Sequence, residues 1–212
     1  MSWSEVAQIN KGIRNRAYTN AWVIENSTTW TAPSTQFYQV IAVGAGGSST
    51  AGPSNIDYRG GGSGGVCVSA LRITANTQAT ITTGSGGSST FSVSASGTSV
   101  TMNAGGGGDA TYDNAGTGGT AIGGTYNYPG NTGTPGCASV GCFLTGLSDI
   151  RHITRTLENG TTTVEFESYG ILRHGIGGGG TKDETGSSSG YRDVRVQPTG
   201  GCVIIIPLGD YV

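Results

Sequence analysis

Three groups of residues have types and spacings that could carry out catalysis. Residues 61–65, Gly-Gly-Ser-Gly-Gly, satisfy the G-x-S-x-G pattern of a nucleophilic serine on a strand-to-helix turn. Glu165 and Glu167 alternate along a strand-like stretch, which would place two carboxylates about 7 Å apart on one face, as in glycoside hydrolysis. His152 and His174 lie near arginines and acidic residues and could act as acid-base groups.

Each of these patterns also has a simpler structural explanation. A chain with 40 glycines produces G-x-S-x-G strings by composition, and no strand-to-helix context surrounds Ser63. Charged residues on an open sheet face are usually solvated, which accounts for the glutamates and the histidines. We therefore predict a non-enzymatic protein with no catalytic residues, and keep polysaccharide depolymerase activity as an alternative.

The four cysteines, Cys67, Cys137, Cys142 and Cys202, predict neither a metal site nor a disulfide framework. CxxC pairs are absent and the two histidines are not spaced with the cysteines as zinc ligands, so we expect no metal and no cofactor. Free buried thiols are the default, because the N-terminus carries no export signal. Cys137 and Cys142 are close enough in sequence to form a disulfide under oxidising conditions.

Tyrosines in polar, glycine-rich stretches are the candidates for ligand binding. A tyrosine on a rigid loop offers a flat apolar face to a sugar ring or a protein, and a hydroxyl for hydrogen bonding. The alternative is that these rings only cover the glycine-rich part of the fold. The candidate ligand-binding residues are Tyr58, Tyr112, Tyr126, Tyr128 and Asp113.

Composition excludes several classes of protein. Glycine at 40 of 212 residues is costly in helix interiors, and the abundant Ser, Thr, Val and Ile favour strands and turns. The net charge is −2 with scattered Lys and Arg, so we expect no nucleic-acid binding. The longest apolar run, residues 203–206, is too short to span a bilayer, so we expect no membrane insertion and no standard export route.

The sequence divides into two regions with different residue patterns, one at the N-terminus and one over the rest of the chain. Ser2 and Glu5 form a capping-box pattern before apolar residues at helical spacing, which predicts a short amphipathic helix over residues 3–14. Such a helix needs a docking partner, either its own domain or another chain. We therefore expect an attachment helix and linker at 1–20 and a glycine-rich β-domain at 21–212.

Short β-rich runs with frequent alternation predict the strands of that domain. Asn159-Gly160 predicts a hairpin between strands at 150–157 and 162–169. Trp22 and Trp30 are expected in the core or at the junction with the helix. The remaining predicted strands are 38–43, 66–68, 71–73, 79–82, 91–94, 99–102, 192–197 and a central, doubly apolar strand at 202–206.

Residues 104–137 have a glycine repeat that fits neither helix nor strand. Stepping by three from Gly118 visits Ala121, Gly124, Asn127, Gly130, Gly133 and Gly136, all small or compact. Three is the period of the polyproline II helix, and glycine on one edge lets such helices approach and hydrogen-bond. We therefore predict packed extended helices; a flexible linker is the alternative, and proline is too rare for collagen.

Several stretches in order resemble the glycine-rich domain of phage tail fibres and related appendages. They are residues 29–33 (Thr-Trp-Thr-Ala-Pro), 40–47, 60–65, 81–91 and 103–108, with a closing strand after Gly201. Residues 144–174 depart from the family pattern. The opening residues 2–6 resemble, over a short span, tail and baseplate-associated proteins of phages and phage-like particles of Gram-positive bacteria.

The resemblance implies a β-sandwich whose glycine-rich excursions form compact lattices or loops. It also implies a virion tail protein, made in the host cytoplasm and released by lysis, that binds a bacterial surface polysaccharide or protein receptor. Other tail or baseplate proteins would bind the N-terminal helix, and fibre proteins commonly form homotrimers. The alternative is a purely structural fibre, baseplate or decoration protein, which should bury its tyrosines where a binding protein exposes them.

Overall fold

The computed structural model describes residues 21–51, 58–84, 87–95, 98–133, 149–156, 162–169, 179–184, 191–196 and 200–209. The predicted helix at 3–14, Cys137, Cys142 and His174 lie outside these ranges. Every regular element within them is a β-strand, so the predicted all-β class is confirmed.

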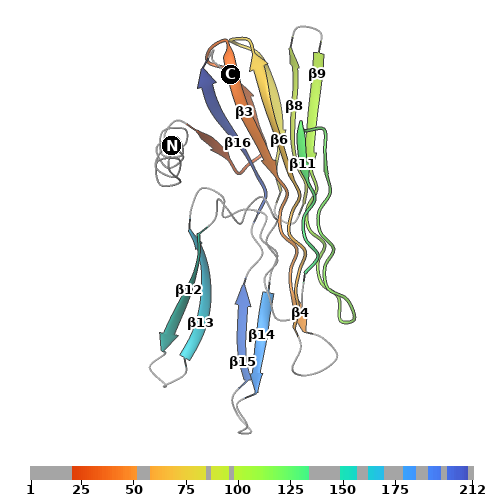
Figure 1. Ribbon diagram of the computed structural model, residues 1–212, viewed down its shortest axis with the longest axis vertical. Coiled ribbons are helices and arrows are strands. Elements are labelled where there is room, and N and C mark those ends of the chain that lie inside the picture. Colours follow the sequence, from red (N-terminus) through yellow and green to blue (C-terminus); the bar gives the residue numbers. More distant parts are fainter. Residues whose placement is uncertain are drawn as a thin grey trace, which may run out of the picture.

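Two five-stranded antiparallel sheets pack face to face, as the predicted β-sandwich requires (Figure 1). Every strand of each sheet pairs antiparallel with its neighbours. The first sheet has the order β1 (Trp22–Ile24), β16 (Cys202–Gly209), β3 (Gln36–Val43), β6 (Val66–Ile73) and β11 (Tyr126–Tyr128). The second has the order β10 (Ala121–Ile122), β9 (Thr98–Ala104), β8 (Ser89–Ala95), β7 (Gln78–Thr82) and β2 (Thr28–Thr31).

The core lies between the sheets and follows from the alternation of side chains along each strand. In β7 the burial pattern alternates strictly, with Ala79 and Ile81 buried between exposed polar neighbours. Ile81 and Phe91 are paired in the β7–β8 register and are both fully buried. Burying each such side chain stabilises the fold by about 1.5 to 3 kcal/mol.

An aromatic cluster joins the two sheets near one edge. Trp30 on β2 makes an edge-to-face contact with Tyr38 on β3, with ring centroids 5.1 Å apart, and a second with Trp22 on β1 at 5.6 Å. Trp30 is 7% exposed, and Trp22 packs against the same buried cluster. Of the two places expected for Trp22 and Trp30, the core or the junction with the helix, the structure shows the core: Trp30 is buried in it and Trp22 is partly buried against it.

The first sheet is apolar on both faces. Along β3, Val40 and Ala42 belong to the cluster between the sheets, whereas Ile41 and Val43 belong to a second buried cluster. Residues of β6 and β16 divide between the two clusters in the same way. The prediction that the 202–206 strand is doubly apolar and central is confirmed, since β16 lies between β1 and β3.

Three two-stranded ladders complete the described strands. The predicted hairpin around Asn159-Gly160 is confirmed by the pairing of β12 (Asp149–Thr156) with β13 (Thr162–Tyr169). The predicted strand at 192–197 is β15 (Tyr191–Val196), but its partner β14 (Gly179–Glu184) was not predicted. The third ladder pairs β4 (Thr50–Ala51) with β5 (Tyr58–Arg59).

Candidate binding site at the end of the glycine lattice

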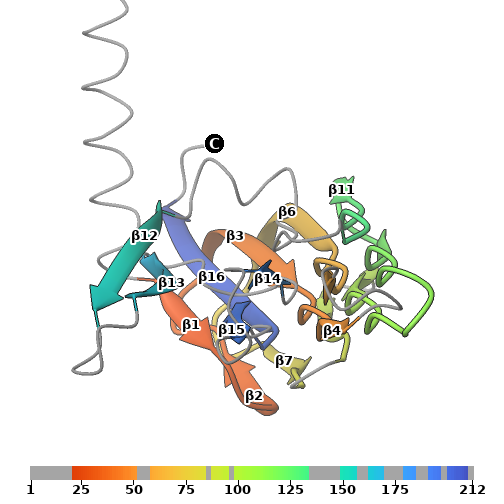
Figure 2. The same cartoon turned by 90° about the horizontal axis from the view of Figure 1, so that it is seen from below.

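Five extended segments continue from the ends of sheet strands and run side by side away from the sandwich (Figure 1). They follow β3, β9 and β11 and precede β6 and β10, and Figure 2 shows such segments nearly end-on as small coils beside the sheets. We call them the glycine lattice. Its segments are residues 44–48, 60–65, 105–110, 116–120 and 130–133.

Backbone hydrogen bonds join these segments at steps of three residues. The N–H groups of Gly44 and Gly47 donate to the carbonyls of Gly65 and Gly62, both at 2.9 Å. Segments 105–110 and 116–120 are joined in the same way, by bonds from Gly105 and Gly108 at 2.7 Å. A three-residue repeat matches the polyproline II helix, which has no internal hydrogen bonds and so leaves its backbone groups available to neighbours.

Segment 60–65 is the centre of the lattice, because it bonds to all four others. Gly62 donates to Gly108 at 3.0 Å, and Ser63 donates to Asn131 at 2.9 Å. Its carbonyls accept from Gly47 and from Gly119, both at 2.9 Å. Backbone groups that are buried here are therefore satisfied without a β-ladder.

Glycine is required in the lattice by close approach of the segments. A Cβ at Gly62 would lie closer than 3.0 Å to the carbonyl oxygen of Thr117, and one at Gly107 would meet the carbonyl of Gly62 in the same way. Backbone atoms at this distance cannot rotate aside as a side chain can. The other lattice glycines whose Cβ would meet a backbone carbonyl are Gly44, Gly47, Gly61, Gly64, Gly65, Gly116, Gly118, Gly119, Gly130 and Gly133.

The prediction of packed extended segments with a three-residue repeat was therefore correct for the lattice segments. It was wrong in continuing that repeat without a break from residue 118 to residue 136. Residues 121–122 and 126–128 are strands β10 and β11, joined by a tight turn that contains Gly123 with φ of 85°. Segments 44–48 and 60–65 belong to the lattice although the period rule did not include them. Gly136 lies outside the described residues.

Ser63, the serine of the G-x-S-x-G pattern, has a structural position in the lattice. Its side chain is fully buried, and its Oγ accepts the N–H of Asn131 at 2.7 Å. The surrounding residues are extended segments and not the strand-to-helix turn that exposes a nucleophilic serine. The hydroxyl thus joins segments 60–65 and 130–133.

The loops between lattice segments meet at the end remote from the sheets. There Ala110 donates to Ser48 at 2.8 Å, Gly116 donates to Gly60 at 2.9 Å and Gly133 donates to Gly116 at 2.8 Å. The β4–β5 ladder caps the connection between segments 44–48 and 60–65. We call this end the lattice tip, which comprises the described residues 48–51, 58–60, 109–116 and 131–133.

A two-residue turn projects from the lattice tip. Thr111 donates its N–H to the carbonyl of Asn114 at 2.8 Å, and the N–H of Asn114 donates to the Thr111 hydroxyl at 3.2 Å. Tyr112 and Asp113 lie between these two anchors; Tyr112 is 59% exposed and Asp113 is also exposed. The turn thus presents an aromatic ring and a carboxylate on a fixed backbone.

The base of this turn is fastened to the neighbouring loop. The carboxylate of Asp109 accepts the N–H of Ser48 at 2.6 Å, beside the backbone bond from Ala110 to Ser48. A charge-assisted bond of this kind is stronger than one between neutral groups. The turn that carries Tyr112 is therefore positioned by the lattice.

The five predicted binding residues do not form one site. Tyr58, on β5, lies with Tyr112 and Asp113 at the lattice tip by chain position, although its side chain is outside the described part. Tyr126 and Tyr128 lie on β11 at an edge of the first sheet. Segment 116–120 lies between the lattice tip and the start of β10, and at the rise of a polyproline II helix this segment alone is about 12 Å long.

A family model for the glycine-rich domain matches residues 23–204. The chain belongs to the glycine-rich domain family. No curated protein matches the sequence. The family match spans most of the sandwich strands and the whole glycine lattice.

In this glycine-rich domain two further exposed apolar side chains lie on β10 and β11, which follow each other in the chain but belong to different sheets. Tyr126 is 61% exposed and Ile122 is 60% exposed, whereas Tyr128 is half-buried against the outer cluster of the first sheet. The side chain of Asn127 closes the turn between β10 and β11 by bonds to the N–H and carbonyl of Gly124, at 3.0 and 2.8 Å. The exposure of Ile122 was not predictable from the sequence, because one isoleucine among glycines and threonines carries no signal of exposure.

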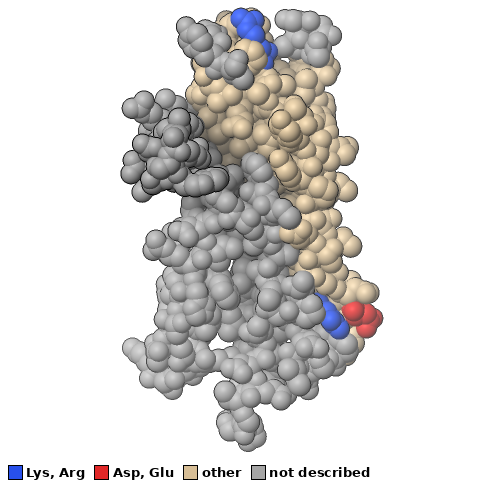
Figure 3. Space-filling model, in the orientation of Figure 1, with Lys and Arg blue, Asp and Glu red and all other residues tan. Residues whose placement is uncertain are grey.

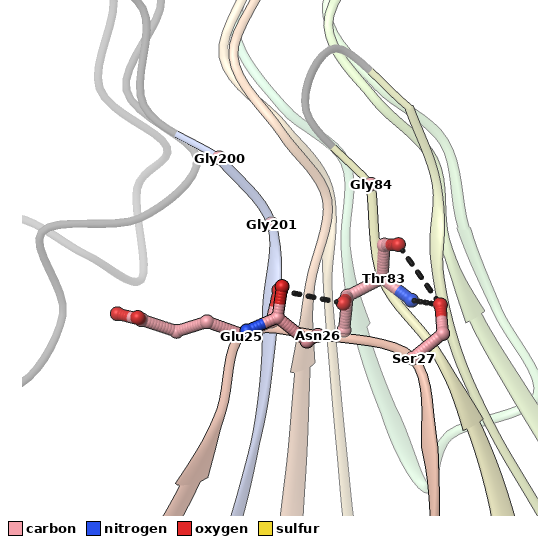
Figure 4. Close-up of a pocket in the computed structure, with 7 residues that line it drawn as sticks. All are labelled: Glu25, Asn26, Ser27, Thr83, Gly84, Gly200 and Gly201. Atoms are coloured by element: carbon pink, nitrogen blue, oxygen red, sulfur yellow. Dashed lines mark hydrogen bonds between the residues drawn. The ribbon is translucent and has the colours of Figure 1, made fainter.

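A polar depression of about 590 Å³ lies where the glycine-rich domain passes from sandwich to lattice (Figure 4). Ser27 and Thr83 bond to each other across it, and the Thr83 hydroxyl donates to the carbonyl of Glu25 at 2.8 Å. Figure 4 shows the Glu25 side chain directed away from these hydroxyls. The hydroxyl groups of the depression therefore bond mainly within the wall.

Few charged side chains lie in the two sheets and the lattice of the glycine-rich domain. Among the residues whose side chains the structure describes, which exclude β12 to β15, the charged ones are Glu25, Arg59, Arg72, Asp109 and Asp113. On the described part of the face in Figure 3, charged atoms accordingly show only in small groups near the two ends, with acidic and basic atoms together at the lattice end. Within the described ranges, no group of three or more His, Cys, Asp or Glu could hold a metal ion, and no helix could cross a membrane.

Both described cysteines of the glycine-rich domain are free and buried, as predicted for them. Burial raises the pKa of the Cys202 thiol to about 12, and the negative charge of Glu25 adds to this shift. Burial also raises the pKa of Cys67, whose Sγ lies 3.2 Å from the Asn103 carbonyl. Neither thiol has the lowered pKa of a reactive cysteine.

Proposed function

We propose that this glycine-rich domain is the receptor-binding part of a phage tail fibre or tail appendage, and that it contacts the bacterial surface through the lattice tip. The observation that carries the proposal is the exposed Tyr112-Asp113 turn, held on a lattice whose backbone groups bond to one another. A preorganised turn binds with little loss of conformational entropy. The resemblance to tail-appendage proteins supplies the biological setting.

The exposure of the tyrosines supports binding over a purely structural role. Tyr112 and Tyr126 each expose about three-fifths of their surface, whereas a component that only covers the glycine lattice would bury them. In the proposal, the amphipathic sequence at 3–14 attaches the chain to other tail or baseplate proteins, in a homotrimer. The lattice tip then points toward the cell.

The proposal is tested by binding of the purified protein to a panel of bacterial strains, with Tyr112→Ala compared with Tyr126→Ala. The two rings have nearly equal exposure, so the two truncations are matched, but only Tyr112 lies at the lattice tip. Losing a central aromatic contact costs about 1 to 2 kcal/mol, so Tyr112→Ala should weaken binding roughly 5- to 30-fold. Tyr126→Ala should bind as the parent protein does.

The outcomes separate the candidate functions. Strain-restricted binding that is lost only in Tyr112→Ala supports a receptor-binding tip. A loss confined to Tyr126→Ala would move the site to strand β11 and its neighbour β10. No binding to any strain would refute the proposal in favour of a structural role in the particle. Circular dichroism of both variants checks that they are folded.

A further inference from the structure

We infer that the ligand of the lattice tip is an uncharged polysaccharide. The inference rests on the proposed receptor-binding function and names the chemistry of the receptor. It is carried by the distribution of charge along the glycine-rich half of the chain, by the kinds of groups at the tip, and by the rigidity of the tip turn.

Residues 44–148 contain very few charged side chains. They hold two arginines and three aspartates, which gives this stretch a formal net charge of −1. The rest of the chain holds the majority of its 11 basic and 13 acidic residues. This stretch, which includes the lattice, is thus the least charged part of the sequence.

An anionic receptor would need a net positive charge, whereas the described tip residues hold Arg59 against Asp109 and Asp113, and the adjoining strand β14 holds Lys182 against Asp183 and Glu184. Phosphate-rich polymers are bound by lysines and arginines that neutralise their charges. Of the two arginines, Arg72 is on β6 near the opposite end of the sheet, and Arg59 is partly buried with an enclosed Nε that has no hydrogen-bond partner. Asp109 and Asp113 at the tip would repel a polyanion.

The described groups of the tip also suit a sugar better than a protein surface. Protein interfaces need a buried apolar centre of several residues. Tyr112 is the only large, strongly exposed hydrophobic side chain among the tip residues whose side chains are described, a set that does not include Tyr58. It is surrounded by exposed hydroxyl, amide and carboxylate groups of Thr111, Asn114 and Asp113.

This set of groups matches the two sides of a neutral sugar. The ring of Tyr112 offers an apolar plane for the C–H face, and the carboxylate of Asp113 accepts bonds from hydroxyls. The backbone bonds between Thr111 and Asn114 fix the relative position of the two residues. Fixed geometry is what allows a small contact to discriminate among polyols.

The test measures the affinity of the full chain for a bacterial strain that it binds in the experiment of the previous section, while NaCl is raised from about 0.1 M to about 1 M. This increase in salt shortens the Debye length from about 10 Å to about 3 Å. A neutral ligand predicts less than about a twofold change in affinity, because no counterions are released. A polyanionic ligand predicts about a five- to eightfold loss for every phosphate that is neutralised. A steep salt dependence would overturn the inference and leave receptor binding intact.

Enzymatic and chemical treatment of the same cells separates sugar from protein. Periodate, which cleaves vicinal diols, should abolish binding, whereas digestion of surface proteins with protease should not change it. Binding that survives periodate and is lost with protease would show a protein receptor and refute the inference. If the untreated cells of every strain fail to bind, the proposed function itself fails.

Discussion

Replacing Gly62 by alanine should destabilise the protein strongly, because this glycine lies in the central lattice segment. Its added Cβ would lie within 3.0 Å of the Thr117 carbonyl oxygen, a backbone atom. Relieving that contact requires segment 116–120 to move from segment 60–65, which strains the bonds from Gly116 to Gly60 and from Gly119 to Ser63, both 2.9 Å. Overpacking of about 1 to 3 kcal/mol and two weakened bonds of about 0.5 to 1.5 kcal/mol each give a loss of roughly 2 to 6 kcal/mol.

Urea unfolding followed by circular dichroism measures this loss, with Gly84→Ala as the matched control. A Cβ at Gly84 meets nothing within 4 Å, and its φ lies outside the left-handed region. Alanine there should be neutral or should stabilise by up to about 1 kcal/mol, through a smaller entropy of the unfolded chain. If Gly62→Ala unfolds within about 1 kcal/mol of Gly84→Ala, the close approach of the lattice segments is not rigid and the argument fails.

Two further predictions concern the sandwich. Trp30→Ala should lower the free energy of unfolding by about 3 to 5 kcal/mol, because it removes the ring between Trp22 and Tyr38; a urea midpoint near that of the parent would contradict the packing. Because the pKa of Cys202 is about 12 when folded and 9.0 for an unperturbed cysteine thiol, its contribution to stability is complete below pH 9 and is lost as pH rises toward 12. Between these values the parent should lose roughly 1.4 kcal/mol per pH unit more than Cys202→Ala, and parallel pH curves from urea titrations would exclude this effect.

The sandwich was predictable from the sequence because its strands carry period-2 or doubly apolar patterns. The runs that became β3, β7 and β16 are rich in β-branched residues and end at glycine clusters. Strand β14 was missed since Gly-Gly-Thr-Lys-Asp-Glu has no apolar alternation and owes its conformation to its partner β15. Short edge strands such as β10 are determined by pairing and not by propensity.

The candidate site was less predictable, because the loops that form it are distant in sequence. No short sequence pattern indicates that Ser48, Gly60 and Gly116 lie together at the lattice tip. Backbone hydrogen bonds between segments that are distant in sequence bring them there. The three-residue glycine repeat of the sequence also continues through residues 121–128. In the structure, however, β10 pairs with β9 and β11 pairs with β6, so these residues form strands and not a lattice segment. That change of structure is what separates Tyr126 and Tyr128 from Tyr112.

The way in which the lattice is stabilised makes binding and stability separable at its tip. Inside the lattice the stabilising groups are backbone N–H and carbonyl groups, and the chief demand on sequence is the absence of a Cβ where segments approach. The carboxylate of Asp109 fastens the base of the turn to the neighbouring loop, whereas the side chains of Tyr112 and Asp113 are exposed. Side chains of the turn can therefore be exchanged to alter ligand contacts while the backbone that holds them stays in place. A loop that is fixed by its own side-chain packing does not permit such exchange.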